Sequence, residues 1–153
     1  MEIKEVNKRS ISEQNKRLNR RFIQFEKLIS ELRSKSIPNE IVNAINTDIE
    51  QINLFPSSEK DFRRLLKKTQ SRILKLVDKE LKLVPVNHYR NNFMGIGIAM
   101  GVAFGAALGS SSDNSSLISL GIPLGMVIGM AIGSAKDKKA KESGLQLDLE
   151  IRF

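Results

Sequence analysis

The stretch that decides the fold is residues 93–135, FMGIGIAMGVAFGAALGSSSDNSSLISLGIPLGMVIGMAIGSA. It contains two apolar runs, 93–109 and 117–135, and neither run carries a charged residue. A short polar loop, SSSDNSS, separates the runs, and Asp113 is its only charge. Each run would be about 25–29 Å long as a helix, at about 1.5 Å per residue. That length suffices for a hydrocarbon core of about 30 Å, so the pattern predicts a transmembrane helical hairpin.

The residues that flank the hairpin predict its orientation. Arg90 precedes the first run, the second run is followed by Lys136, Lys138, Lys139 and Lys141, and the loop has no Lys or Arg. Because Lys and Arg concentrate on the cytoplasmic side, we expect both termini in the cytoplasm and the loop outside. The amino-terminal residues are charged throughout and lack the apolar core of a secretory signal, which agrees with this topology.

Glycines recur every four residues in both runs, and this spacing places them along one ridge of each helix. The ridges are Gly97, Gly101, Gly105 and Gly109 in the first run, and Gly121, Gly125, Gly129 and Gly133 in the second. In water each interior glycine would weaken a helix by about 1 kcal/mol relative to alanine. In lipid, glycine ridges let helix backbones approach closely, so we expect these residues to form the helix-packing surface.

The first helix has a second ridge of small residues, Gly95, Ala99, Ala103 and Ala107, about 200° around the helix from the first. Two interpretations follow: either the hairpin packs only on itself, or several copies assemble with the first helix packed on both sides. We favour the homo-oligomer. If it encloses a lumen, the candidate lining is the bulky ridge of Ile96, Met100, Phe104 and Leu108, with Arg90 and Asp113 at the two mouths.

Composition argues against catalysis. The 153 residues include one His, one Tyr and no Cys, so a catalytic triad, a thiol nucleophile and a cysteine zinc site have no candidates. No phosphate-binding loop is present, because the four-residue glycine spacing lacks a GKS or GKT ending. We therefore expect no enzyme activity, no catalytic residue, no cofactor and no bound metal.

The formal net charge of +8 is concentrated before the hairpin. Two basic clusters stand out: Arg17, Arg20 and Arg21, and Arg63, Arg64, Lys67 and Lys68. Solvated helix faces are the first interpretation, and anionic lipid headgroups are the next, since a cytoplasmic domain would lie close to them. Nucleic acid is the least favoured partner, because the sequence contains no RNA- or DNA-binding motif.

Residues 1–84 predict a cytoplasmic helical domain with three helices, over about 10–35, 38–54 and 58–83. In the first helix, Ser10 and Glu13 fit a capping box. Its apolar residues repeat every seven, with Asn15 at one seam position, so the helix is either a coiled-coil strand or one amphipathic helix of a small bundle. Ser58 with Asp61 predicts the cap of the third helix. These helices could also bind another protein.

Two short segments complete the domain organisation. Residues 85–92 are predicted to be a juxtamembrane linker, and residues 136–153 a cytoplasmic basic segment that ends in a strand. In LQLDLEIRF, at 145–153, apolar residues alternate strictly with polar ones, which is typical of a half-buried strand. A single strand is not stable alone. Its partner is either the extended stretch 84–87 or the same tail in a neighbouring subunit.

From Tyr89 onward, YRNNFMGIGIAMGVAFGAALG and GIPLGMVIGMAIGSAKDKKAKESGLQLDLEIRF, the chain resembles small bacterial glycine-zipper membrane proteins with two transmembrane helices. The resemblance covers about the last 65 residues and implies the bacterial inner membrane, with no specific activity. The fold expected is an all-α membrane protein: a cytoplasmic helical bundle or coiled coil, a glycine-zipper hairpin at 93–135 and a short carboxyl-terminal β-strand.

Three functions remain open. The first is a homo-oligomeric pore or membrane-perturbing channel, in which the hairpins assemble through their small residues. The second is a membrane-anchored helical scaffold or partner-binding subunit without a pore. The third and least favoured is a membrane-tethered nucleic-acid-binding module.

Overall fold

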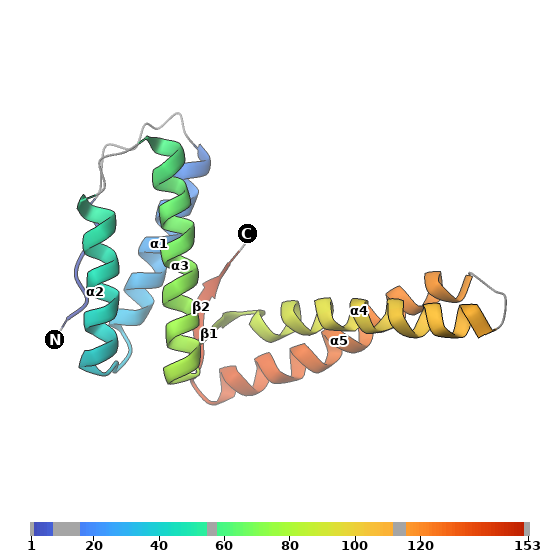
Figure 1. The fold of residues 1–153 in the computed structure, drawn as a ribbon. Helices are drawn as coiled ribbons and strands as arrows, with labels where there is room; N and C mark the ends of the chain where they lie inside the picture. Colours follow the sequence, from blue (N-terminus) through green and yellow to red (C-terminus); the bar gives the residue numbers. More distant parts are fainter. Residues whose placement is uncertain (1, 8–15, 55–57, 112–115, 152–153) are drawn as a thin grey trace. The chain divides into compact units, whose positions relative to one another are not determined.

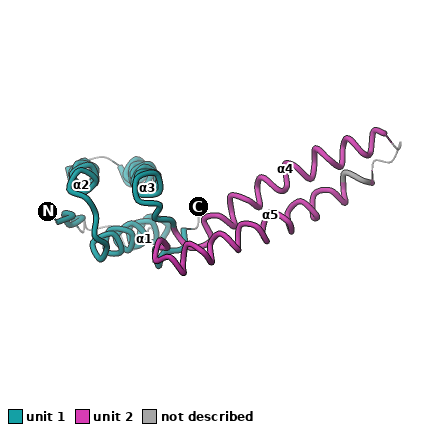
Figure 2. The backbone as a smooth tube through the Cα atoms, turned by 90° about the horizontal axis from the view of Figure 1, so that it is seen from below, with its two compact units in different colours: residues 1–84, 147–153 teal, residues 85–146 magenta. Residues whose placement is uncertain are grey.

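The computed structural model describes residues 2–7, 16–54, 58–111 and 116–151. The chain forms two compact units. Unit 1 comprises residues 1–84 and 147–153, and unit 2 comprises residues 85–146 (Figure 2).

Unit 1 is built on three helices, α1 Lys16–Arg33, α2 Asn39–Leu54 and α3 Glu59–Leu81. Helices α2 and α3 run antiparallel side by side, and α1 crosses them (Figures 1 and 2). The apolar face of each helix is buried, as the helical spacing predicted. The largest fully buried side chains include Phe25, Leu28, Leu32, Ile45, Ile49, Ile52, Leu66, Ile73 and Val77. Helix α1 is thus one helix of a small bundle, and Ser10, Glu13 and Asn15 lie outside the described residues.

The ends of α3 have specific caps. The Ser58 hydroxyl accepts a hydrogen bond from the Asp61 backbone N–H at 3.4 Å, which confirms the predicted cap. At the other end Lys82 takes a left-handed conformation with φ 57° and donates its N–H to the Asp78 carbonyl. The left-handed residue stops the helix before Pro85 can clash with it.

A small parallel sheet pairs β1 Val84–Val86 with β2 Gln146–Glu150. Along the tail Leu147, Leu149 and Ile151 are buried, whereas Asp148 and Glu150 are exposed, so the predicted alternation is confirmed over residues 147–151. Arg152 and Phe153 lie outside the described residues. The partner of the strand is the extended stretch of the same chain, the first of the two partners considered.

Unit 2 is a hairpin of two long helices, α4 His88–Ser111 and α5 Ser116–Glu142 (Figure 1). Both helices extend beyond the apolar runs. Residues 88–92, which the sequence predicted as linker, form the first turn of α4, and the basic residues 136–142 are the last two turns of α5. Helix α5 ends in a Schellman motif: Gly144 has φ 70°, and the Leu145 N–H bonds the Ala140 carbonyl at 2.9 Å.

Candidate functional site

The helices of the hairpin meet along their glycine ridges. In α4, the buried residues are Gly97, Gly101, Gly105 and Gly109. In α5, Gly129 and Gly133 are buried and Gly121 and Gly125 are half-buried. The larger residues between the ridges stay at the edges of this seam or face away from it. The hairpin therefore has a core made of main chain, as close glycine packing requires.

The contact between the ridges leaves no room for a side chain. A Cβ atom added at Gly101 would overlap the carbonyl oxygen of Gly121 and lie 2.8 Å from its carbonyl carbon. Conversely, a Cβ atom added at Gly121 would overlap the carbonyl oxygen of Gly101. Gly97 and Gly125 stand in the same reciprocal relation, so the two backbones touch over successive turns.

Close approach continues to the polar end of the hairpin. A Cβ atom at Gly129 would overlap the backbone of Phe93, and one at Gly133 would lie 2.7 Å from the backbone nitrogen of Arg90. The obstacles are backbone atoms in both cases, and backbone cannot rotate away as a flexible side chain can. The seam is therefore continuous from the middle of the helices to the start of α4.

The second small ridge of α4 has no such contact. Nothing lies within 4 Å of a Cβ atom built at Gly95, and Ala99, Ala103 and Ala107 are exposed. Gly95, predicted to pack against a helix, thus contacts none within the hairpin. Of the two small faces predicted for α4, the hairpin uses one and leaves the other on its surface.

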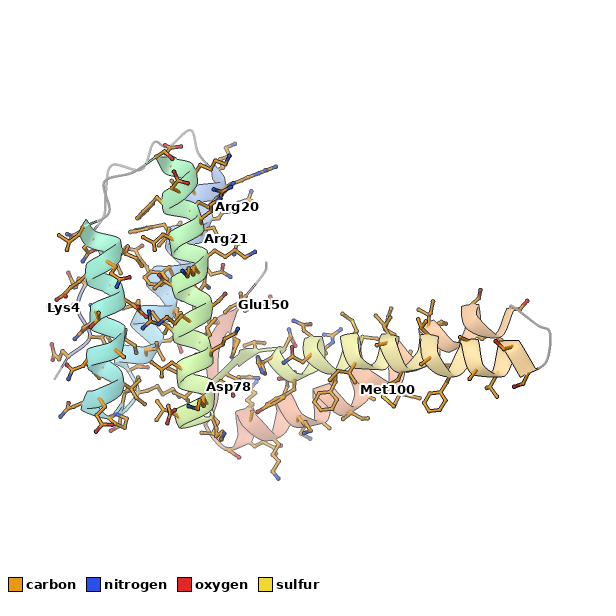
Figure 3. All side chains as sticks on the ribbon, in the orientation of Figure 1. Lys4, Arg20, Arg21, Asp78, Met100 and Glu150 are labelled. Atoms are coloured by element: carbon orange, nitrogen blue, oxygen red, sulfur yellow. The ribbon has the colours of Figure 1, made fainter. Side chains whose placement is uncertain are left out.

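The predicted pore-lining residues also lie on the surface of the hairpin. Ile96, Met100, Phe104 and Leu108 are between 53% and 63% exposed, and Met100 projects from α4 (Figure 3). Helix α5 has a matching exposed ridge of Leu120, Leu124, Ile128 and Ile132. Both ridges are therefore placed to contact lipid or a neighbouring hairpin.

Asp137 stabilises the polar end of the hairpin, a role that no pattern in the sequence predicted. Its two carboxylate oxygens accept hydrogen bonds from the backbone N–H groups of Tyr89 at 3.0 Å and Arg90 at 2.9 Å. These N–H groups belong to the first turn of α4, where a helix has unsatisfied donors and a partial positive charge. Asp137 thus caps α4 from α5. The only signal in the sequence is one acid within a run of lysines.

Interfacial residue types surround this cap. The Lys136 ammonium lies 4.8 Å from the centre of the Phe93 ring, within the range of a cation–π interaction. His88 contacts Tyr89 edge to face, and its ring nitrogen is 3.2 Å from the Asn92 amide. Arg90, a predicted mouth residue, is exposed, and Asp113, the other one, lies outside the described residues.

In unit 1 the fold brings the two predicted basic clusters together. Residues of both clusters, Arg17, Arg20, Arg21, Arg63, Arg64 and Lys67, line one pocket of about 1020 Å³ between α1 and α3. Arg20 and Arg21 are labelled in Figure 3. One guanidinium nitrogen of Arg21, Nη1, is buried without a hydrogen-bond partner. A converging set of cations of this kind suits a phosphate group.

Nothing in the described part of the chain resembles a metal site. Over residues 2–7, 16–54, 58–111 and 116–151, no three His, Asp or Glu side chains gather closely enough to hold an ion.

Both hairpin helices are long and apolar enough to cross a membrane. The spans are His88–Ser111 and Ser119–Glu142, with mean hydropathy of 1.7 and 1.3. Only 17% and 11% of their most apolar windows are buried, so they do not resemble the core helices of a soluble protein. Residues 87–139 match a family model described as "Glycine zipper membrane protein". This segment belongs to that family. The glycine zipper hairpin matches no curated protein and no solved structure.

Proposed function

We propose that the glycine zipper hairpin is the repeating unit of a homo-oligomeric pore or membrane-perturbing channel. The observation that carries the proposal is that α4 has two ridges of small residues and that the hairpin buries only one of them. The second ridge is exposed, and it consists of Gly95, Ala99, Ala103 and Ala107. In lipid, a ridge of small residues lets the backbone of another helix approach closely, and the van der Waals contacts of that approach favour helix association. A second copy of the hairpin offers such a helix.

In such an assembly α4 lies next to the lumen. The exposed ridge of Ile96, Met100, Phe104 and Leu108 then forms an apolar constriction of the kind that gates by dewetting. Neither apolar run carries a charge, so ion selectivity comes from the mouths, where Arg90 stands on one side and Asp113 on the other.

We further propose that the protein lies in the bacterial inner membrane with both termini in the cytoplasm. The lysines at the end of α5 and Arg90 at the start of α4 support this orientation through the preference of basic residues for that side. The basic pocket of unit 1 suits anionic headgroups of the same leaflet. The proposal includes no enzymatic activity.

The first test is the oligomer mass in detergent, with a matched pair of substitutions. Ala103→Leu fills the open ridge of α4, whereas Ala131→Leu adds the same side chain to an exposed position of α5. Neither alanine lies in the hairpin seam. Light scattering should give an oligomer for the wild type and Ala131→Leu, and a smaller species for Ala103→Leu. A lone monomer for the wild type would refute the assembly.

Conductance tests the pore itself. Planar-bilayer recordings of the wild type should show discrete openings, which Ala103→Leu abolishes and Ala131→Leu preserves. Phe104→Ala should raise the open fraction, because it removes the largest side chain from the constriction. An oligomer that never conducts would instead support a membrane-anchored scaffold.

A further inference from the structure

Residues 2–7 of unit 1 lie against α2 and are held there by the side-chain amides of two asparagines. The first is Asn46, which is 6% exposed. Its Nδ2 donates to the Glu2 carbonyl at 3.1 Å, and its Oδ1 accepts from the Lys4 backbone N–H at 2.7 Å. One side chain thus satisfies a donor and an acceptor of the extended main chain, as a neighbouring strand would.

The second asparagine repeats this arrangement one step along. Asn53 donates to the Glu5 carbonyl at 3.0 Å and accepts from the Asn7 N–H at 2.9 Å. Asn46 and Asn53 are seven residues apart, or about 10.5 Å along a helix. The groups they bind are three residues apart in the segment, or about 9–10 Å in an extended chain. The helix and the segment therefore match in length.

The segment also follows a period of three on its apolar side. Ile3 is buried and Val6, three residues later, is half-buried, whereas the residues between them are exposed. A polyproline II helix has three residues per turn, so it returns both its main-chain groups and its side chains to the same face at this spacing. A flat strand, with a period of two, would turn the second set away.

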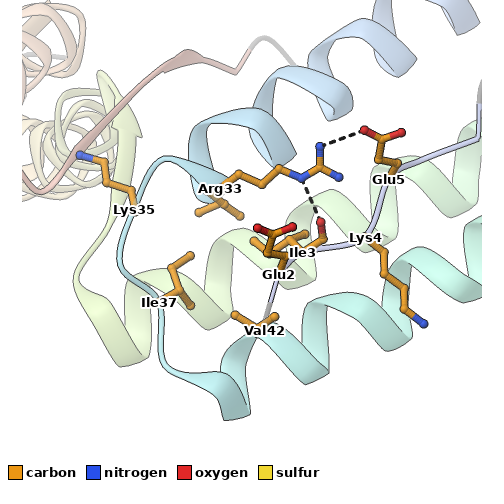
Figure 4. Close-up of a pocket in the computed structure, with 9 residues that line it drawn as sticks. Glu2, Ile3, Lys4, Glu5, Arg33, Lys35, Ile37 and Val42 are labelled. Carbon is orange, nitrogen blue, oxygen red and sulfur yellow. Dashed lines mark hydrogen bonds and ion pairs between the residues drawn. The ribbon is translucent and has the colours of Figure 1, made fainter.

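Side chains around the segment add sequence preference. Ile3 lies with Val42 and Ile37 along a pocket between α1 and α2 (Figure 4). On either side of it, the Lys4 ammonium pairs with Glu50, and the Glu5 carboxylate lies 3.6 Å from the Arg33 guanidinium. The groove therefore favours an apolar residue followed by a basic and then an acidic one.

Arg33 also binds the main chain of the segment, because its Nε donates to the Ile3 carbonyl at 3.0 Å (Figure 4). The segment nevertheless fills the groove incompletely. Pockets of about 520 and 470 Å³ run along it, and Ile3 is its only buried side chain among residues 2–7. Most of what holds the segment is hydrogen bonding to its backbone, and a backbone of another chain can form the same bonds.

We propose that the face of α2 carrying Asn46 and Asn53 is a binding site for an extended peptide, and that residues 2–7 of a second copy exchange with the chain's own segment there. Every copy carries one segment and one groove, so exchange preserves each hydrogen bond and ion pair. Local concentration then decides between the two arrangements. This step rests on the proposed assembly, which holds several copies close together.

Cross-linking tests the exchange in the full chain. The sequence has no cysteine, so introduced thiols pair unambiguously. One tagged copy carries Lys4→Cys and a differently tagged copy carries Glu50→Cys, at the site of the ion pair. Oxidation in co-expressing membranes should give a disulfide between the two tags. Gln51→Cys, on the exposed face of α2 next to Glu50, is the matched control and should give at least tenfold less product.

A second experiment tests the site without requiring assembly. Ile3→Asp puts a charge at a buried position and should release the chain's own segment from the groove. A labelled peptide of residues 2–7, EIKEVN, should bind this variant at least tenfold more tightly than the wild type. Adding Asn46→Leu should reverse the gain, because it removes two hydrogen bonds. Circular dichroism should show the same helix content in each variant.

The outcomes separate the two proposals. Peptide binding that depends on Asn46, together with cross-linking between tags, supports both the site and the exchange. An intact oligomer in which Lys4→Cys and Glu50→Cys give no disulfide between the two tags would overturn the exchange but not the assembly. Peptide binding that is unaffected by Asn46→Leu would overturn the site itself. A monomer that still binds the peptide would refute the assembly and the exchange, but not the site.

Discussion

Replacing Gly101 with alanine should loosen the hairpin, although alanine is the better helix former. The added Cβ atom would lie 2.8 Å from the Gly121 carbonyl carbon and 3.3 Å from the Gly125 Cα, and closer still to the Gly121 oxygen. Carbon atoms in contact prefer separations of about 3.5–4.0 Å. The helices must therefore move apart by about 1 Å at this turn.

The cost of that movement can be set against the gain in helix propensity. Overpacking a tight contact costs about 1–3 kcal/mol, and relief of the glycine penalty returns at most about 1 kcal/mol. Gly95→Ala is the matched control on the same helix, since nothing lies within 4 Å of its new Cβ atom. The difference between the two variants should thus be about 1–3 kcal/mol in favour of Gly95→Ala.

Spin labels on cysteines at Ala99 and Ala131 would report the separation of the helices, because the chain has no other cysteine. In mild detergent, Gly101→Ala should lengthen or broaden the distance distribution, and Gly95→Ala should leave it unchanged. Titration with dodecyl sulfate should separate the helices of Gly101→Ala at a lower mole fraction. Equal midpoints and equal distances for the two variants would refute backbone contact at this seam.

Two further predictions concern buried carboxylates. Asp137→Ala should speed hydrogen exchange at the Tyr89 and Arg90 amides by about fivefold, since a lost cap costs about 1 kcal/mol. Asp137→Asn keeps one acceptor and should have a smaller effect, and unchanged exchange in both variants would contradict the cap. Burial raises the pKa of Asp48, and the Arg72 guanidinium at 3.1 Å only partly offsets this effect. The folded state therefore binds the Asp48 proton more tightly than the unfolded state does. The chain should lose stability as the pH rises through that raised pKa. Thermal unfolding between pH 3 and 7 should show this loss in the wild type but not in Asp48→Asn, and parallel curves would argue against it.

Periodic features of the sequence predicted most of this fold. Three features repeat with the period of the helix or strand that carries them: the glycine ridges, the apolar faces of α2 and α3, and the alternation of the tail. Because they repeat, they can be recognised from the sequence alone. The start of α4 within a predicted linker shows the limit of this approach. Asn87, with φ 62°, turns the chain immediately before His88, and a single left-handed residue leaves no periodic trace.

Contacts between single residues far apart in sequence could not be predicted in this way. Asp137 caps a helix through residues that lie 47 and 48 positions earlier, and Asn53 binds a segment that lies 46 to 48 residues before it. Each is one polar residue in a stretch whose composition is unremarkable. The sequence predicted the helix-packing ridges and the basic clusters, whereas only the fold shows the partners of Asp137, Asn46 and Asn53.

The glycine seam has a mechanical consequence. Its glycines recur every four residues in both helices, so a shift of one helix along the other by about 6 Å would again place glycine opposite glycine over much of the seam. The seam therefore determines which faces of α4 and α5 meet, but it determines their axial register only weakly. Contacts that do not repeat along the helices, such as those of Asp137, must fix this register. The glycine spacing alone therefore permits more than one axial register, and the cap from Asp137 to Tyr89 and Arg90 is satisfied in only the observed one.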